Sequence, residues 1–81
     1  MDRPAIQAKL QDLIRDFFDD PSVVLHDETT AKDVKGWDSI AHIDLVCFVE
    51  RAFKIKISTR EVLKLESIGE FTDLIAQKIG Q

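Results

Sequence analysis

The chain has 81 residues, of which 44% are hydrophobic and 32% charged, and its formal net charge is −4. This size allows one globular domain with a modest core and no deep cavity walled by two layers, so we expect a single domain over residues 1–81. The acidic balance argues against nucleic-acid binding, because phosphate contacts need clustered Lys and Arg.

Potential metal ligands and cysteines are few. Cys47 is the only cysteine, which excludes an intrachain disulfide and a cysteine-based zinc site. Neither His26–Glu28 nor the pair His42 and Asp44 has a recognised ligand spacing, so we predict no metal site. Because no apolar run is long enough for a signal or membrane helix, we expect a cytoplasmic monomer that does not insert into membranes.

The first predicted helix covers residues 4–18. Pro4 suits its first turn, with Asp2 just ahead as a cap, and Asp19–Pro21 ends it because the residue before proline disfavours the α conformation. Its apolar side chains recur at helical spacing on one face: Ile6, Leu10, Leu13, Ile14 and Phe17.

Residues 21–38 form a long polar connection, of a length that is usually functional or contains a helical turn. We expect Val24, Leu25 and Val34 to pack onto the core, and a turn near Thr30–Asp33.

The second predicted helix, residues 39–53, has two apolar stripes. The first is expected in the core and comprises Leu45, Val49, Ala52 and Phe53, with Val46 or Phe48 alongside. The second stripe, Ile40, Ile43 and Cys47, is displaced around the helix. Spacing alone leaves open whether this second stripe is buried or faces a partner.

The remaining segment contains two more helices. Lys54–Ile57 is expected to be an extended connector with Ile55 and Ile57 inserted into the core. A capping box from Ser58 to Glu61 begins a short helix that carries Val62, Leu63 and Leu65, and a second box from Ser67 to Glu70 opens the last helix. The last helix carries an apolar face made of Ile68, Phe71, Leu74, Ile75 and Ile79. The predicted fold is therefore an all-α four-helix bundle, with three main helices, one short helix and a long first connection.

Among the reactive side chains, Ser39 has the most favourable position for chemistry, because it lies at the start of the second predicted helix. A serine nucleophile needs a base, a group that orients the base and an oxyanion hole. His42 lies one turn away, but Trp37 and Ala41 stand where the pattern G-x-S-x-G has glycines, so we disfavour a hydrolase. Two other interpretations remain: simple capping of the helix in a small adaptor domain, or modification of Ser39. The positive helix end would favour an anion on Ser39 Oγ by about 0.3–1 kcal/mol.

The sequence Asp38-Ser39-Ile40, at the start of the second helix of a small acidic four-helix domain, closely resembles the acyl carrier protein family. That family has the attachment motif Asp-Ser-Leu at this place, and Ile40 keeps the apolar character of its leucine. The resemblance covers nearly the whole chain, including the connector Phe53–Ile57.

The resemblance implies a carrier rather than an enzyme. A phosphopantetheinyl transferase, with magnesium, would move 4′-phosphopantetheine from coenzyme A to Ser39, and Asp38 would help it recognise the site. The arm would carry acyl groups as thioesters between enzymes of fatty-acid, polyketide or specialised lipid synthesis that present basic patches. The contact residues implied on the second helix are Ile40, Ile43, Asp44, Cys47 and Glu50.

Some residues depart from the housekeeping fatty-acid carriers. Trp37 replaces a common alanine, and His42, Arg51, Lys54 and Lys56 make this region less acidic. These departures favour a specialised polyketide, lipid or aminoacyl pathway. A peptidyl carrier of nonribosomal synthesis is the alternative, although such carriers more typically have glycines and His or Asn before the serine.

Overall fold

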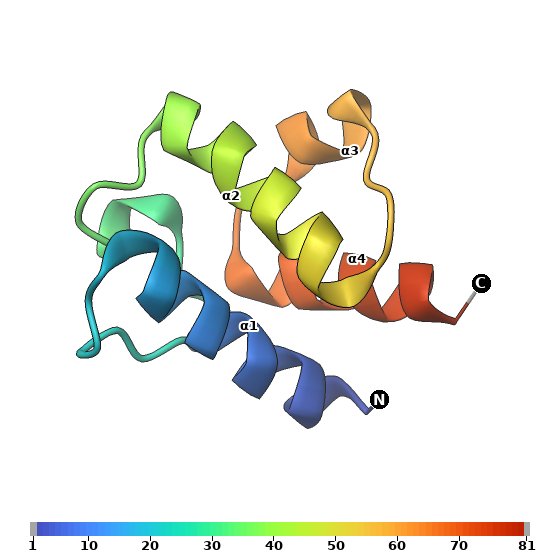
Figure 1. The fold of residues 1–81 in the computed structure, drawn as a ribbon, viewed down its shortest axis with the longest axis horizontal. Helices are drawn as coiled ribbons and strands as arrows, with labels where there is room; N and C mark the ends of the chain where they lie inside the picture. Colours follow the sequence, from blue (N-terminus) through green and yellow to red (C-terminus); the bar gives the residue numbers. More distant parts are fainter. Residues whose placement is uncertain (1, 81) are drawn as a thin grey trace.

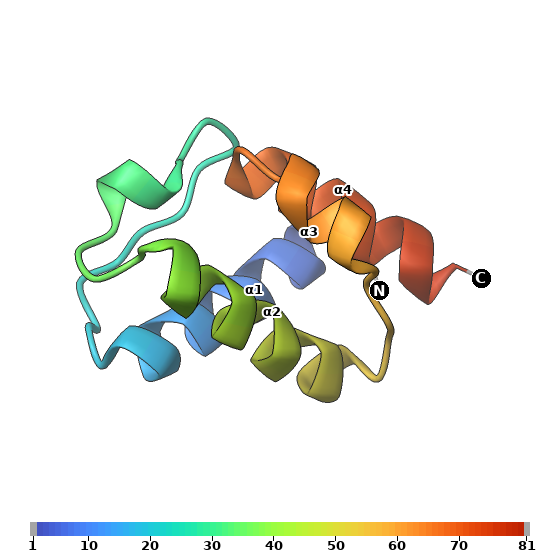
Figure 2. The same cartoon turned by 90° about the horizontal axis from the view of Figure 1, so that it is seen from above.

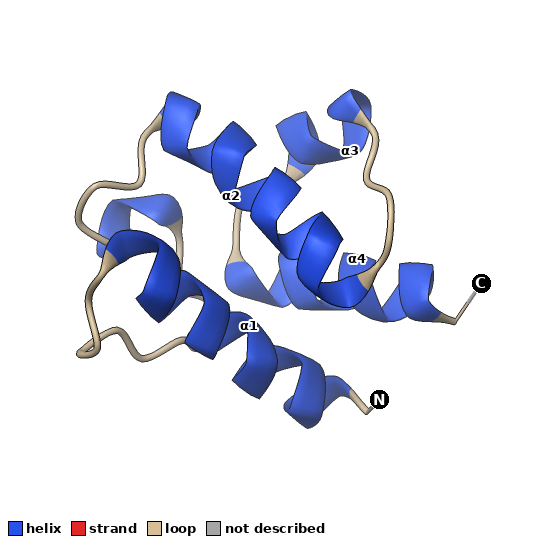
Figure 3. Cartoon of the chain, viewed as in Figure 1, coloured by secondary structure: helices blue, strands red, loops and turns tan. Residues whose placement is uncertain are grey.

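The computed structural model describes residues 2–80, and within them it contains helices, turns and loops but no strand (Figure 3). The elements are α1 (Arg3–Phe18), the 3₁₀ turn η1 (Ala31–Asp33), α2 (Ser39–Phe53), α3 (Thr59–Lys64) and α4 (Ile68–Ile79). The prediction of three main helices, one short helix and a long first connection is confirmed. None of the described helices is long and apolar enough to cross a membrane.

The three long helices share one core. Helix α1 packs against both α2 and α4. The loop between α1 and α2 lies at one end of the molecule, and the short α3 lies beside α2 toward the other (Figures 1 and 2). The most deeply buried apolar side chains come from α1, α2 and α4: Ile6, Leu10, Ile14, Leu45, Val46, Val49, Ile68, Phe71 and Ile75.

Capping explains where the long helices begin and end. The Asp2 carboxylate accepts a hydrogen bond from Ala5 N–H at 2.9 Å at the start of α1, as expected for a cap. Helix α1 ends because Asp19 takes a left-handed conformation with φ of 52°. Helix α2 ends in the same way at Lys54, with φ of 58°, and the chain then runs extended with Ile57 buried and Ile55 packed against the core. The predicted connector is confirmed.

The loop between α1 and α2 agrees with the prediction in part. The turn expected near Thr30–Asp33 is η1, and Leu25 and Val34 are buried as expected. The prediction for Val24 is wrong, because its side chain is 57% exposed and Val23 is buried instead. The chain is extended here, so successive side chains point to opposite sides and only alternate residues reach the core.

This loop also supplies hydrogen bonds to the start of α4. Ile68 N–H donates to the carbonyl of Thr29 and Gly69 N–H to the carbonyl of Asp27, each at 2.8 Å. These are donors that a helix leaves unpaired in its first turn. The loop is therefore fixed to α4 through its backbone.

Only one of the two predicted capping boxes is complete. Ser58 and Glu61 exchange bonds at the start of α3, with Glu61 N–H donating to Ser58 Oγ at 3.2 Å and Ser58 N–H to Glu61 Oε1 at 2.9 Å. At α4, Glu70 N–H donates to Ser67 Oγ at 3.3 Å, and within residues 2–80 the Glu70 carboxylate returns no bond. The prediction of a second capping box is therefore wrong for the bond from Ser67 N–H to the Glu70 carboxylate. At this helix start, carbonyls of the loop already accept hydrogen bonds from the N–H groups of Ile68 and Gly69.

Candidate functional site

Ser39 is the first residue of α2, and its side chain is exposed. Asp38 is the N-cap, and its Oδ1 accepts a hydrogen bond from Ala41 N–H at 2.8 Å. The Ser39 hydroxyl makes no hydrogen bond to any residue in the described part of the chain. The first-turn N–H groups of Ser39 and Ile40 have no carbonyl partner within the helix. A phosphate ester on Ser39 Oγ would thus reach solvent beside the positive end of α2, so these residues fit a phosphopantetheine group.

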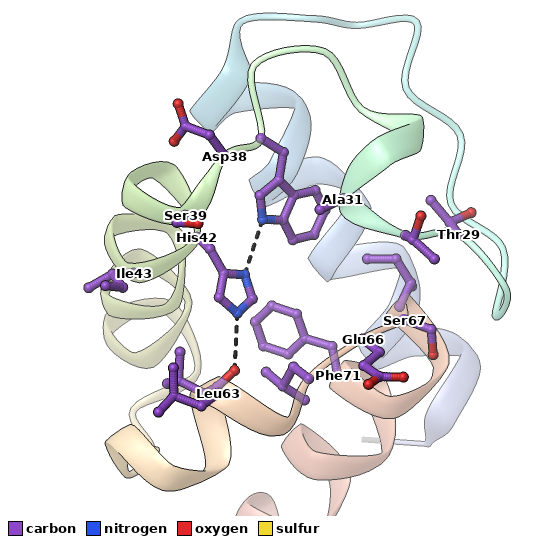
Figure 4. A pocket seen from close by; sticks show the side chains of 15 residues that line it. Thr29, Ala31, Asp38, Ser39, His42, Ile43, Leu63, Glu66, Ser67 and Phe71 are labelled. Atoms are coloured by element: carbon purple, nitrogen blue, oxygen red, sulfur yellow. Dashed lines mark hydrogen bonds between the residues drawn. The ribbon is translucent and has the colours of Figure 1, made fainter.

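His42 is not available as a general base for Ser39. Its Nδ1 accepts a hydrogen bond from Trp37 Nε1–H at 3.1 Å, and its Nε2 lies 3.2 Å from the carbonyl oxygen of Val62 (Figure 4). Both ring nitrogens are therefore already paired, and a serine nucleophile needs one of them. The geometry argues against the hydrolase interpretation.

Trp37 packs between α1 and α2. Its indole is half-buried, with its ring centroid 5.7 Å from that of Phe18 and 5.9 Å from the imidazole of His42. Gly36 precedes it with φ of 91°, a conformation that favours glycine, and directs the chain back toward Phe18. The sequence carries no signal that pairs Trp37 with His42, since the pair depends on how the loop folds back onto α2.

An apolar pocket of about 360 Å³ lies beside Ser39 (Figure 4). The loop, α2, α3 and α4 all contribute to its wall. Its lining includes Trp37, Ser39, His42, Val62, Ile68 and Phe71. A chain of this size is expected to have no deep cavity walled by two layers. The pocket lies where the loop, the short α3 and the first turns of α2 and α4 meet.

The second stripe of α2 is on the surface. The side chain of Ile40 is 76% exposed and that of Ile43 is 57% exposed, and Asp44 and Cys47 are exposed as well. Leu63 of α3, 77% exposed, adds a further apolar side chain. The question that spacing left open is thus answered in favour of a solvent-facing stripe.

The core stripe of α2 lies on another face. Leu45, Val46 and Val49 are fully or almost fully buried. Of the two residues left open for this stripe, Val46 is buried and Phe48 is half-buried against Phe17, with ring centroids 5.8 Å apart.

Glu50 differs from the other predicted contact residues. It is half-buried, and its Oε2 accepts a hydrogen bond from Ile57 N–H at 2.9 Å. Its carboxylate therefore fixes the connector to α2. Arg51 is exposed and continues the helical spacing of Asp44 and Cys47. The solvent-facing stripe thus changes from acidic near Ser39 to basic at its far end.

Comparisons with known proteins identify the family of the chain. A family model described as the phosphopantetheine attachment site matches residues 8–75. The holo acyl carrier protein of Geobacter metallireducens, solved by NMR, is 38% identical with a TM-score of 0.86, over 91% of this chain and 85% of that one. The acyl carrier protein of Thermotoga maritima, a crystal structure, is 29% identical with a TM-score of 0.85, over 99% of this chain and 93% of that one. The comparison with curated proteins gave no significant match. The chain therefore belongs to the phosphopantetheine attachment family, as a carrier domain of the acyl carrier protein type.

Proposed function

We propose that this chain carries acyl groups on a 4′-phosphopantetheine arm attached to Ser39 Oγ, and delivers them between enzymes of fatty-acid, polyketide or specialised lipid synthesis. The observation that carries the proposal is the exposed Ser39 hydroxyl at the first position of α2, unpaired among the described residues, in a chain of this family. When bound, the group supplies the thiol on which cargo is held. The chain itself contributes the attachment point and the surfaces that partners read.

Asp38 has two roles in this proposal. Through Oδ1 it caps α2 and fixes the first turn that presents Ser39. Its carboxylate is also exposed, so a phosphopantetheinyl transferase can contact it without unfolding the helix start. Asp38 would thus serve both the local structure and recognition by the transferase.

The pocket beside Ser39 supports an apolar cargo. Its volume of about 360 Å³ is within the range of small-molecule sites, roughly 300–1,000 Å³. Leu65, Ile68 and Phe71 are among its lining residues and provide apolar contact for an acyl chain. An aminoacyl cargo is the alternative, because the carboxylates of Asp38 and Glu66 also line the pocket and could pair with an ammonium group.

The solvent-facing stripe of α2 supports a partner surface of mixed character. Ile40 and Ile43 provide apolar contact, and Asp44 fits a basic patch on a partner enzyme. Arg51, on the same stripe, requires a neutral or acidic group on any partner that covers the whole helix. A mixed surface of this kind fits a specialised pathway better than a housekeeping one. We place these encounters in the cytoplasm, with the chain as a monomer.

Intact-mass analysis tests the attachment. The purified chain is incubated with coenzyme A, magnesium and a broad-specificity phosphopantetheinyl transferase. We expect a mass increase of one phosphopantetheine in the wild type and in Ser22→Ala, a control at an exposed serine of the loop, and none in Ser39→Ala. If the folded wild type takes up no arm from several transferases, the proposal is wrong, and a small helical adaptor becomes the leading interpretation.

A further inference from the structure

The hydrogen bonds of His42 define its protonation state. An indole N–H can only donate, so the bond from Trp37 Nε1–H at 3.1 Å requires that His42 Nδ1 has no hydrogen. A backbone carbonyl can only accept, so the 3.2 Å contact with Val62 O requires a hydrogen on Nε2. The two partners together select the neutral imidazole with its hydrogen on Nε2.

Protonation of His42 would affect the two bonds differently. The imidazolium carries hydrogens on both nitrogens, so the bond from Nε2 to Val62 O would remain. At Nδ1, however, a hydrogen would face the hydrogen of Trp37 Nε1–H, and two donors cannot bond to each other. A proton on His42 therefore breaks the link to Trp37 and leaves the link to α3 intact.

The link to Val62 has a structural reason of its own. Val62 lies in the last turn of α3, where helix carbonyls lack partners within the helix. Its carbonyl accepts from Leu65 N–H at 3.3 Å and from His42 Nε2 at 3.2 Å. A helix of six residues is marginal without such support. His42 therefore joins α2 to α3 in both of its protonation states.

Trp37 lies in the wall of the pocket, so its release would affect how well the pocket is closed. It is half-buried, lines the pocket next to Ser39 and stacks on His42, with ring centroids 5.9 Å apart (Figure 4). Without its acceptor on His42, the indole keeps only its packing, including that against Phe18. The end of the pocket formed by the loop would then be less firmly closed.

The charged groups that line the same pocket come from two elements. Asp38 belongs to the loop, and Glu66 to the connection between α3 and α4. The pocket residues of α3 and α4, which include Val62 and Phe71, carry no charge. Any effect of pH on Trp37 must therefore be separated from titration of these two carboxylates.

We propose that His42 is a positioning residue, which in its neutral form holds Trp37 against the pocket beside Ser39 and on protonation releases it. The proposal concerns the wall of the pocket and not the arm. It rests on the proposed function only in its consequence, that cargo attached at Ser39 is enclosed less well when His42 is protonated.

The first experiment uses the full chain with Ser39→Ala, so that no arm is present. Trp37 is the only tryptophan, so its indole N–H gives one signal in an ¹H–¹⁵N NMR spectrum. As the pH is lowered from about 8 until His42 is protonated, we expect the indole signal to shift in one step, with faster exchange of its hydrogen with water. No shift of the indole signal would overturn the proposal.

Matched variants identify the group responsible. The only other histidine, His26, is exposed, and in His26→Gln the indole signal should titrate as before. Glu66→Gln and Asp38→Asn, which each remove one carboxylate of the pocket, should likewise leave the step in place. In His42→Asn the amide oxygen can replace Nδ1 as acceptor but does not titrate, so the step should disappear. A step that persists in His42→Asn, or that is lost in any of the other variants, contradicts the proposal.

The tautomer can be measured in the unaltered ring, in case His42→Asn does not fold. Long-range ¹H–¹⁵N correlations at about pH 8 should show an unprotonated Nδ1 and a protonated Nε2 at His42. A predominant hydrogen on Nδ1 would overturn the proposal by itself. With the arm loaded with an octanoyl group, His42→Leu should show faster thioester cleavage by hydroxylamine than the wild type. If no arm can be loaded, the proposed function fails, whereas the NMR result on His42 and Trp37 still stands.

Discussion

Gly69 approaches the backbone of Asp27 so closely that no larger residue fits without movement. Its N–H donates to the carbonyl of Asp27 at 2.8 Å, and a Cβ at position 69 would lie 3.0 Å from that same oxygen and 3.2 Å from the Asp27 Cβ. This contact fixes the loop to the start of α4. The loop in turn places Trp37 and closes one side of the pocket.

Gly69→Ala should therefore destabilise the protein. Alanine gains up to about 1 kcal/mol of helix propensity, but crowding against backbone atoms costs about 1–3 kcal/mol and weakens the hydrogen bond to Asp27. We expect a net loss of about 1–2 kcal/mol in the free energy of unfolding, measured with urea. Gly80→Ala is the control, because its Cβ would lie 3.5 Å from the nearest atom at a φ of −74°. Equal stability of Gly69→Ala and wild type would show that the loop moves freely away from α4.

Glu50 should act on stability, whereas Asp44 should not. Glu50→Ala leaves the half-buried N–H of Ile57 without its acceptor, at a cost of about 1–3 kcal/mol. Glu50→Gln retains an acceptor oxygen and should lose less. Asp44→Ala, at an exposed position of the same helix, should stay within about 0.5 kcal/mol of the wild type. Urea unfolding compares the three variants, and equal effects at positions 44 and 50 would contradict a structural role for Glu50.

The sequence was sufficient to predict those parts of the fold that follow from local patterns. Apolar spacing and capping residues together predicted the four helices, and Asp2, Ser58 and Ser67 predicted where three of them begin. Ser39 could be singled out because its place at a helix start depends only on neighbouring residues. The family resemblance then indicated which chemistry to expect at Ser39, the attachment of 4′-phosphopantetheine.

The pocket could not be predicted in this way. It depends on hydrogen bonds between backbone groups of the loop and of α4. Almost every residue carries the same backbone groups, so the sequence does not show which of them will pair. The link from Trp37 through His42 to Val62 joins the loop, α2 and α3, and no spacing in the sequence reports it. Val24 was misplaced because three successive apolar residues in an extended segment do not reveal which of them point inward.

Acid should weaken the contact between α1 and the loop. A hydrogen bond from Gln7 and another from Arg3 lower the pKa of Asp27 below its ordinary value. A carboxylate with a lowered pKa in the folded state contributes stability that is complete above its unfolded pKa, about 4, and is lost as the pH falls through the folded value. We expect the urea midpoint of the wild type to exceed that of Asp27→Asn at neutral pH, with the difference shrinking below about pH 4. The control, Asp12→Asn on the exposed side of α1, should show no such convergence. A difference that stays constant down to low pH would mean that the charge of Asp27 contributes nothing.

Ile43 should matter for partners and not for folding. Its side chain is 57% exposed on α2, so Ile43→Asp should change the free energy of unfolding by less than about 0.5 kcal/mol. The same change at Val49, which is fully buried, should prevent folding or reduce stability severely. With each folded variant loaded through Ser39, transfer of the acyl group to a carrier-dependent enzyme should be slower for Ile43→Asp than for the wild type, mainly through a raised KM. Arg51→Glu provides the complementary measurement, because it should improve transfer to enzymes with a basic rim and impair transfer to those with an acidic one. If Ile43→Asp unfolds the chain, the stripe belongs to the core. If the variant folds and transfers at the wild-type rate, partners do not use this face of α2.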